Sequence, residues 1–172
     1  LIVGANGADP NAVYDAGSSY VIFGRAPDAA VTRIGSAAGQ FIVGGALADE
    51  LSGLGGNDVL EGGDGGDTYL FNPGDGQDTL QDTSGTDIIR FGEGIAASDI
   101  SFTHSGNDLI LGIKGTSDQM TIQYWGYGDV YRIERVEFAD GAAWDAAYLK
   151  SLAAAAPVVG TNGDNYLQGW SG

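Results

Sequence analysis

Aspartates recur at nearly constant intervals through the middle of the chain, each at the end of a glycine-rich segment. They are Asp49, Asp58, Asp67, Asp78 and Asp87. Successive intervals are nine, nine, eleven and nine residues, and two extra residues near Phe71–Pro73 account for the longer one. A large apolar residue follows two places after each aspartate: Leu51, Leu60, Tyr69, Leu80 and Ile89. A short fixed period of this kind predicts a repeat architecture in which successive units stack on one another.

The composition of the repeat defines the shape of each unit. About six residues of glycine-rich turn followed by about three of strand make half a coil, and two halves make one turn of a parallel solenoid. The apolar residue after each aspartate would then point inward and stack on its counterparts. Glycine permits positive φ without a Cβ clash, which lets backbone carbonyl oxygens converge. Carboxylate and carbonyl oxygens are the ligands that Ca²⁺ prefers, so the repeat also predicts calcium sites.

The charge distribution favours a cation as partner. The chain has 23 acidic and 7 basic residues, a net charge of -16, and no Lys or Arg between Arg33 and Arg90. Nucleic acids and anionic membranes require basic patches, so neither is expected as a partner. Unrelieved negative charge opposes compaction, and a bound cation would remove that penalty.

The pattern G-G-x-G-x-D-x-U-x resembles the RTX (haemolysin-type calcium-binding) repeats of secreted bacterial proteins. The resemblance implies several Ca²⁺ ions, each held between turns on one side of the roll by alternate repeats. One column would contain Asp49, Asp67 and Asp87, and the other Asp58 and Asp78. The turn residues expected to contribute oxygens are Gly56, Asn57, Gly65, Gly66, Gly76, Gln77 and Gly85.

Departures from the pattern rank these candidates. Leu47 and Leu54 stand at glycine positions, and the insertion interrupts the step from Asp67 to Asp78. We therefore expect Asp58, Asp67 and Asp78 to form the central sites and Asp49 to be the weakest candidate. The alternative is that each aspartate only makes a local Asx turn. That alternative does not explain several such units in one frame with no basic residue among them.

The rest of the chain has other sequence patterns. Residues 88–144 contain short β-rich runs typical of antiparallel hairpins and resemble the segment that trails RTX repeats, where it would cap the open end of the roll. Residues 145–157 predict a short helix with Asp145 as N-cap or first-turn acid and Pro157 as its stop. Residues 158–172 resemble the start of a further repeat, and residues 1–26 resemble an FG-GAP repeat of integrin-type propellers.

The expected fold class is all-β: a parallel β-roll capped by antiparallel hairpins, with one short C-terminal helix. The expected divisions are 1–34 (FG-GAP-like segment), 35–90 (calcium-binding roll), 91–144 (capping region), 145–157 (helix) and 158–172 (further repeat). Both ends stop in mid-pattern, so we expect the chain to be part of a longer protein.

No catalytic constellation is evident. The chain has no Cys and one His, His104, which is expected as an exposed or hydrogen-bonded strand residue. Glu134 and Glu137, near Arg132 and Arg135, are expected to form cross-strand ion pairs rather than an acid–base pair. The aromatic residues around YWGYGDVY at 124–131 suit either packing of the hairpins or a carbohydrate-stacking platform. No apolar run is long enough to span a membrane.

The expected function is a non-enzymatic, calcium-binding structural or adhesive module of a large secreted or cell-surface bacterial protein. The resemblance implies export by a type I secretion system. Self-association and contact with a cell surface or polysaccharide are the partner interactions considered. The alternatives are the non-catalytic tail of a secreted hydrolase or toxin and, more weakly, a carbohydrate-binding module.

Overall fold

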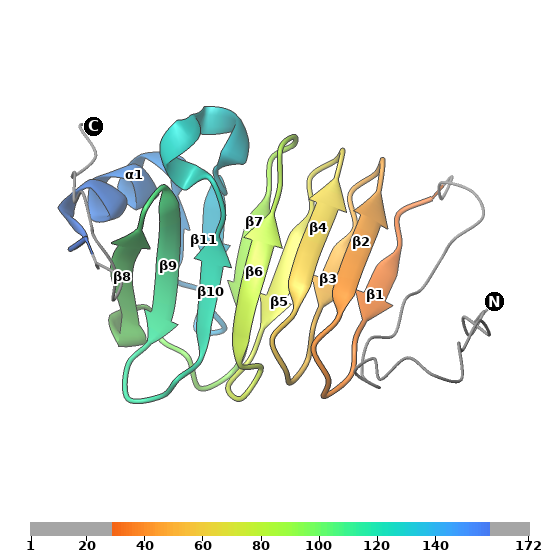
Figure 1. Cartoon of the computed structure of the whole chain (residues 1–172), viewed down its shortest axis with the longest axis horizontal. Coiled ribbons are helices and arrows are strands. Elements are labelled where there is room, and N and C mark those ends of the chain that lie inside the picture. Colours follow the sequence, from red (N-terminus) through yellow and green to blue (C-terminus); the bar gives the residue numbers. More distant parts are fainter. Residues whose placement is uncertain (1–28, 159–172) are drawn as a thin grey trace, which may run out of the picture.

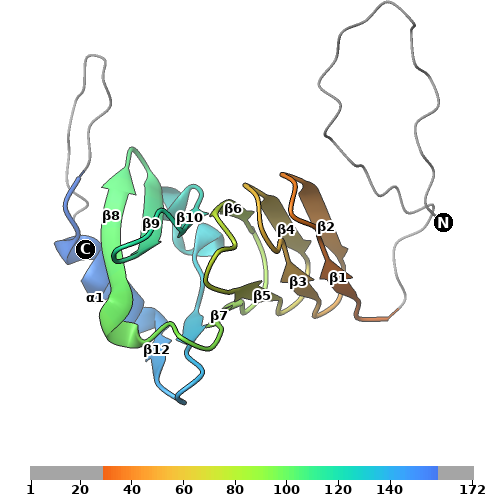
Figure 2. The ribbon, with the colours of Figure 1, turned by 90° about the horizontal axis from the view of Figure 1, so that it is seen from below.

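The computed structural model describes residues 29–158, which form two six-stranded β-sheets facing one another (Figures 1 and 2). Residues 1–26, predicted to resemble an FG-GAP repeat, and residues 159–172 of the further repeat predicted at 158–172 lie outside the described residues. In the described part the chain alternates between the two sheets as it advances along the solenoid axis.

The first sheet contains, in spatial order, β1 (Thr32–Ile34), β3 (Glu50–Ser52), β5 (Thr68–Phe71), β7 (Ile88–Phe91), β11 (Arg135–Glu137) and β12 (Ala143–Asp145). The second contains β2 (Phe41–Gly45), β4 (Val59–Gly63), β6 (Gln77–Gln81), β10 (Gln119–Ile122), β9 (Asp108–Ile113) and β8 (Ile100–Ser105). Pairing is parallel from β1 to β7 and from β2 to β6. These parallel strands confirm the predicted β-roll.

The register of the parallel strands stacks the apolar residues of the repeat. Leu51 pairs with Tyr69, which pairs with Ile89 in the first sheet, and Leu60 pairs with Leu80 in the second. All five side chains are fully buried. The interior of the roll is therefore a narrow apolar core made by the residues that the period singled out.

The two-residue insertion leaves this register intact because a local turn contains it. The backbone N–H of Asn72 donates to Asp75 Oδ2 at 2.7 Å, and that of Asp75 donates back to Asn72 O at 3.2 Å. The turn lies between β5 and β6. Strand β5 still pairs in register with β7, and β4 with β6.

The capping region combines parallel and antiparallel strands. Strands β8, β9 and β10 form an antiparallel meander, and β12 is antiparallel to β11. However, β10 joins β6 and β11 joins β7 in parallel. Stacking thus continues by one turn beyond residue 91, and the antiparallel strands finish both sheets.

Aromatic side chains carry the core from the roll into the cap. Phe91 lies 5.9 Å from Phe71 and 5.5 Å from Phe138, between ring centroids, and Phe138 lies 4.7 Å from Trp144. Three short 3-10 helices connect the strands here: η1 (Ala97–Asp99), η2 (Trp125–Tyr127) and η3 (Asp129–Tyr131). The Trp125 side chain is buried in the same core.

Helix α1 (Ala146–Ala155) packs at the capped end of the roll (Figure 1). Asp145 is its N-cap, as predicted, and accepts a hydrogen bond from Tyr148 N at 2.8 Å. His104 is buried, and its Nε2 atom lies 2.7 Å from Ala153 O, so it is hydrogen-bonded rather than exposed. Within residues 29–158, no helix combines the length and apolarity needed to cross a bilayer.

Candidate metal centre

The repeat aspartates form two columns along the roll, each linked by carboxylate-to-backbone hydrogen bonds. In the first column, Asp67 Oδ1 accepts from Asp49 N at 2.7 Å, and Asp87 Oδ1 accepts from Asp67 N at 2.8 Å. In the second, Asp78 Oδ1 accepts from Asp58 N at 2.9 Å. Each aspartate precedes a strand or opens it, so parallel pairing brings alternate repeats together. The structure therefore assembles the two columns that the period implies.

In four of these carboxylates the second oxygen, Oδ2, is buried without a hydrogen-bond donor. Among the described residues, the Oδ2 atoms of Asp49, Asp58, Asp67 and Asp78 are buried and accept no hydrogen bond. A buried carboxylate oxygen without a donor is costly, because it loses its hydration and gains nothing in return. Oxygen atoms in this state suit a hard cation such as Ca²⁺.

Glycine makes room for these oxygens. A Cβ atom added at Gly53 would lie 2.3 Å from Asp58 Oδ2, and one at Gly62 would lie 2.2 Å from Asp67 Oδ2. Both distances are far shorter than any real contact. The glycine five residues before the aspartate is thus required by the carboxylate itself.

Burial also changes the acidity of the columns. Desolvation, partly offset by the accepted backbone hydrogen bond, raises the pKa of Asp67 to about 6 and that of Asp78 to about 7. Asp87, with the same main cause, has a pKa of about 7. Neighbouring carboxylates raise these pKa values further, and no basic residue occurs between Arg33 and Arg90 to counter them. A bound divalent cation would stabilise the ionised forms.

The predicted turn glycines lie in the turns that connect the two sheets. Gly56, Gly65, Gly76 and Gly85 each precede a repeat aspartate by two residues and have φ of 125°, 140°, 95° and 131°. A Cβ at Gly76 would lie 2.0 Å from Gly56 O, and one at Gly85 would lie 1.9 Å from Gly65 O. Carbonyl oxygens of one turn therefore lie directly against the glycine of the next turn.

The other predicted turn residues differ in their placement. Asn57 is exposed, and its Oδ1 atom accepts from Gln77 N at 3.1 Å. Gln77 is also exposed, and its side chain donates to Ser117 O at 3.3 Å. Gly66 lies against Thr86 O, 3.0 Å from an added Cβ. The Asn57 and Gln77 side chains thus link the turns on the outside, which leaves only their backbone oxygens as candidate ligands.

Two further residues extend the columns and were not predicted to do so. Glu134 Oε2 accepts from Asp87 N at 2.7 Å, which places Glu134 at the end of the first column. Gln40 precedes β2 as Asp58 precedes β4, and its backbone N–H donates to Asp58 Oδ1 at 2.7 Å. Gln40 is nine residues before Asp49, so the nine-residue period could have predicted its place in the column. Glu134 is 47 residues beyond Asp87, and no spacing could reveal it.

The charged residues near Glu134 pair only in part as expected: Glu137 pairs across strands with Arg90, whereas Glu134 accepts from Asp87 N. Glu137 Oε2 lies 3.1 Å from the Arg90 guanidinium, and Glu137 Oε1 lies 2.7 Å from Arg135 Nε. Arg132 pairs with Asp129. The ion pairs of Glu137 lie on the strand surface, and that of Asp129 lies beside η3.

Similarity to known proteins agrees with this geometry. Residues 108–148 match the family described as "Haemolysin-type calcium binding protein related domain". The chain is also 40% identical over 92 residues to the "Iron-regulated protein FrpA" of Neisseria meningitidis serogroup C. Together with the parallel β-roll, these matches support an RTX-type repeat. The match to FrpA covers 49% of this chain and 8% of the relative, so the chain spans only a small part of that protein's length.

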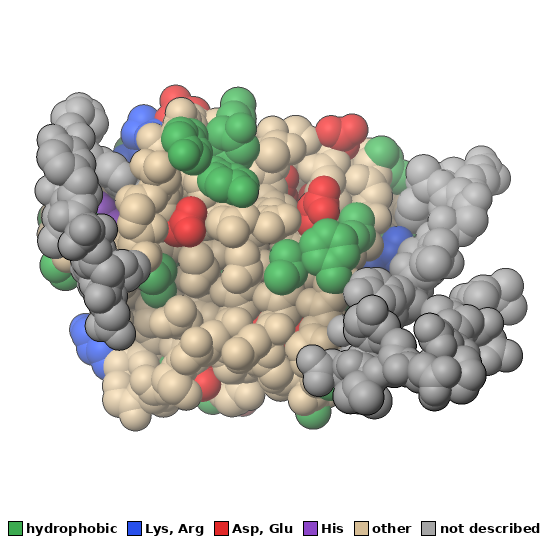
Figure 3. Space-filling model, viewed as in Figure 1, with side chains coloured by type: hydrophobic (Ala, Val, Ile, Leu, Met, Phe, Trp, Pro, Cys, Tyr) green, Lys and Arg blue, Asp and Glu red, His purple; other side chains and the backbone are tan. Residues whose placement is uncertain are grey.

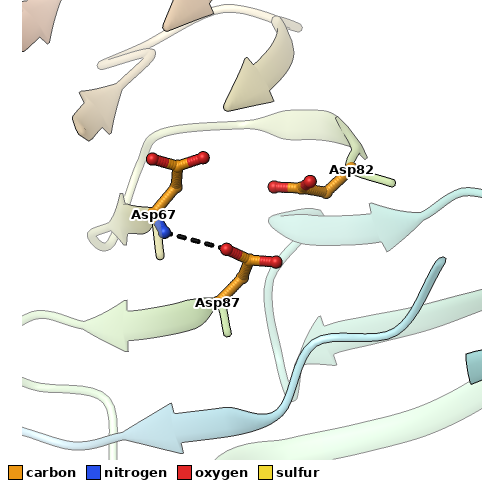
Figure 4. A group of neighbouring side chains, drawn as sticks. All are labelled: Asp67, Asp82 and Asp87. Atoms are coloured by element: carbon orange, nitrogen blue, oxygen red, sulfur yellow. Dashed lines mark hydrogen bonds between the residues drawn. The ribbon is translucent and has the colours of Figure 1, made fainter. Parts of the chain in front are cut away.

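One position departs from the RTX repeat in a way that adds a carboxylate. Glycine stands five residues before Asp49, Asp58 and Asp67, but Asp82 stands five residues before Asp87. Carboxylate oxygens of Asp67, Asp82 and Asp87 all lie within 4.8 Å of one another, and all three residues are buried (Figure 4). The sequence pattern marked Asp82 only as one of many acids in this interval.

Proposed function

We propose that the chain is a calcium-dependent structural module, in which Ca²⁺ ions bound between turns hold the roll in its folded form. The observation that carries this proposal is the set of buried, unpartnered Oδ2 atoms in both aspartate columns. The ligands would be Asp58, Asp67, Asp78 and Asp87, with Asp49 weaker, and carbonyl oxygens from the adjoining glycine-rich turns. The match of residues 108–148 to a haemolysin-type calcium-binding related domain supports calcium as the ion.

The physical mechanism is linkage between binding and folding. Without metal, the buried carboxylates repel one another once they ionise, which favours a looser chain near neutral pH. At extracellular calcium concentrations, sites of about 10⁻⁴–10⁻³ M affinity fill, and their binding free energy adds to the free energy of unfolding. The module would therefore be loose where calcium is scarce and compact where it is abundant.

This behaviour suits a secreted or cell-surface bacterial protein. A chain that stays loose at low calcium can be exported unfolded through a type I secretion system and fold outside. The great length of the relative FrpA, compared with its matched part, supports a module within a larger protein. We further propose that the module is non-catalytic and serves adhesion or self-association, with the tail of a secreted hydrolase or toxin as the alternative.

A second candidate function, carbohydrate binding, has one specific observation in its favour. Tyr124 and Tyr127 are exposed, and with Tyr131 their ring centroids lie 5.7–6.4 Å apart. Figure 3 shows hydrophobic side chains gathered over the η2–η3 segment. A small cavity of about 140 Å³ beside Tyr124 and Tyr131 is also lined by Glu61 and Gln81. Trp125, by contrast, is buried and serves packing.

The main proposal is tested by far-UV circular dichroism and thermal melting of the full chain. We expect a strong β-sheet signal and a raised Tm in about 5 mM CaCl₂, and a weaker signal and a lower Tm in excess chelator. Equimolar MgCl₂ is the matched control, because Mg²⁺ demands a rigid octahedral site and should restore little structure. An unchanged spectrum and Tm in chelator would show that the proposal is wrong.

A further inference from the structure

Asp82 occupies a position where the regular repeat has no side chain. In the regular turns, the Oδ2 atom of the repeat aspartate fills the space beside a glycine, as at Gly53 and Gly62. At the last turn the chain instead places a second carboxylate there. Asp82 begins the turn between β6 and β7, and its side chain is nevertheless buried.

Hydrogen bonds hold the Asp82 carboxylate in one orientation. Its Oδ1 atom accepts from Thr83 N at 2.6 Å and from Ser84 N at 3.1 Å. Its Oδ2 atom accepts from the hydroxyl of Tyr69, which reaches it through the interior of the roll. An ionised carboxylate has about four acceptor sites, so these three bonds leave capacity for a cation.

The Tyr69 hydroxyl, which donates to Asp82, lies near the unpartnered oxygen of Asp67. A Cβ added at Gly62 would lie 2.2 Å from Asp67 Oδ2 and 2.4 Å from the Tyr69 hydroxyl oxygen, so these two oxygens lie on the same side of Gly62. Asp67 Oδ2 is buried without a hydrogen bond and lies beside this cluster. Figure 4 shows the three carboxylates side by side, with Asp82 and Asp87 from the turn between β6 and β7 and Asp67 from the turn before β5.

We propose that Asp82 joins Asp67 and Asp87 in a three-carboxylate site for one hard cation, Ca²⁺ or a lanthanide, with Tyr69 positioning Asp82. This inference rests on the proposed calcium-binding function and adds a ligand that the repeat does not supply. Three carboxylates attract a cation more strongly than two, since site affinity rises with ligand charge. The site would therefore fill before the others in the roll.

Asp75 is the matched control. It too is a buried aspartate in an irregular turn, and it accepts hydrogen bonds from Asn72 N and Asn72 Nδ2. Within the described residues, however, Asp75 is not part of a group of three carboxylates that could share an ion. Removing its charge should leave the proposed site intact.

The experiment is calcium titration of the full chain by isothermal calorimetry, with Tb³⁺ luminescence excited through tyrosine as a second readout. We expect Asp82→Asn to weaken the tightest class of sites by about tenfold or more, and Asp75→Asn to leave it unchanged. Tyr69→Phe removes the hydroxyl that orients Asp82, so it should lower the same affinity by about tenfold. It should also reduce the Tb³⁺ emission, because the nearest phenol is lost.

Asp82→Gly keeps the test decisive, because it restores the residue of the regular repeat and should fold. It should bind calcium with the affinity of the regular sites only. If Asp82→Asn and Asp82→Gly both titrate like wild type, the inference is overturned while calcium binding stands. If wild type itself binds no calcium, the proposed function fails instead, and with it the site.

Discussion

The carboxylate of Asp78 accepts the backbone N–H of Asp58 at 2.9 Å through Oδ1, while its Oδ2 atom is buried without a donor. One oxygen thus joins successive turns, and the other is left for a ligand. The same division of labour holds for Asp67 and its hydrogen bond with Asp49 N. Because each of these aspartates both accepts a hydrogen bond between turns and offers an oxygen to a metal, the stability of the roll depends on metal binding.

Asp49 and Asp67, neighbours in the first column, should differ in their contribution to stability. Asp67 accepts from Asp49 N and donates its own N–H to Asp87 Oδ1, whereas the turn before Asp49 has Leu47 where the others have a glycine of positive φ. We expect Asp67→Ala to remove about 3 kcal/mol of calcium-dependent stability at free calcium about a hundredfold above Kd. Asp49→Ala should remove less. Urea unfolding with and without calcium measures both, and equal losses would contradict the ranking.

The glycine at position 62 should tolerate no side chain. A Cβ there would lie 2.2 Å from Asp67 Oδ2 and 2.4 Å from the Tyr69 hydroxyl. We expect Gly62→Ala to lower the free energy of unfolding by about 2–4 kcal/mol, through overpacking at a buried site. Gly55→Ala is the control, since the nearest atom to its Cβ would be 3.6 Å away. Similar denaturation midpoints for the two variants would disprove the steric requirement.

Glu134 should stabilise the junction between the roll and the cap. Its Oε2 atom accepts from Asp87 N, so Glu134→Ala leaves that buried N–H without a partner and should cost about 1–3 kcal/mol. Glu134→Gln retains an acceptor oxygen and should restore most of the loss. Chemical denaturation in calcium-depleted buffer makes the comparison, and a Gln variant as unstable as the Ala variant would argue against this role.

The pH dependence of the calcium-depleted protein follows from the raised pKa values. Burial raises the pKa of Asp67 to about 6 and those of Asp78 and Asp87 to about 7, against about 3.9 in an unfolded chain. Between about pH 4 and pH 7 the folded state therefore binds more protons than the unfolded state. The free energy of unfolding should fall as pH rises through this window and then level off.

Saturating calcium should reverse that slope, because protons compete with the ion for the same carboxylates. Urea unfolding across this pH range, in calcium-depleted and in calcium-saturated buffer, tests both expectations. A depleted protein that gained stability from pH 4 to pH 7 would show that its aspartates are not held in the protonated form.

Local and periodic patterns in the sequence were sufficient to predict much of the fold and of the candidate metal sites. A nine-residue period of Gly, Asp and apolar residues predicts a parallel roll, since the period sets which residues stack and which turn. It therefore identified the core from Leu51 to Ile89 and the glycines with positive φ, and the resemblance to RTX repeats implied the columns of aspartates. The N-cap at Asp145 followed from equally local chemistry.

The tertiary structure alone decided the contacts that no period encodes. Glu134 joins the first column because the β8–β10 meander fills the interval and returns the chain beside β7 as β11. Asp82 and Asp87 lie at the two ends of the turn between β6 and β7, and parallel stacking brings both beside Asp67, while the Tyr69 hydroxyl donates to Asp82. Spacing along a chain determines neighbours only while the repeat is regular. Where an insertion or a meander intervenes, packing between distant segments determines them instead.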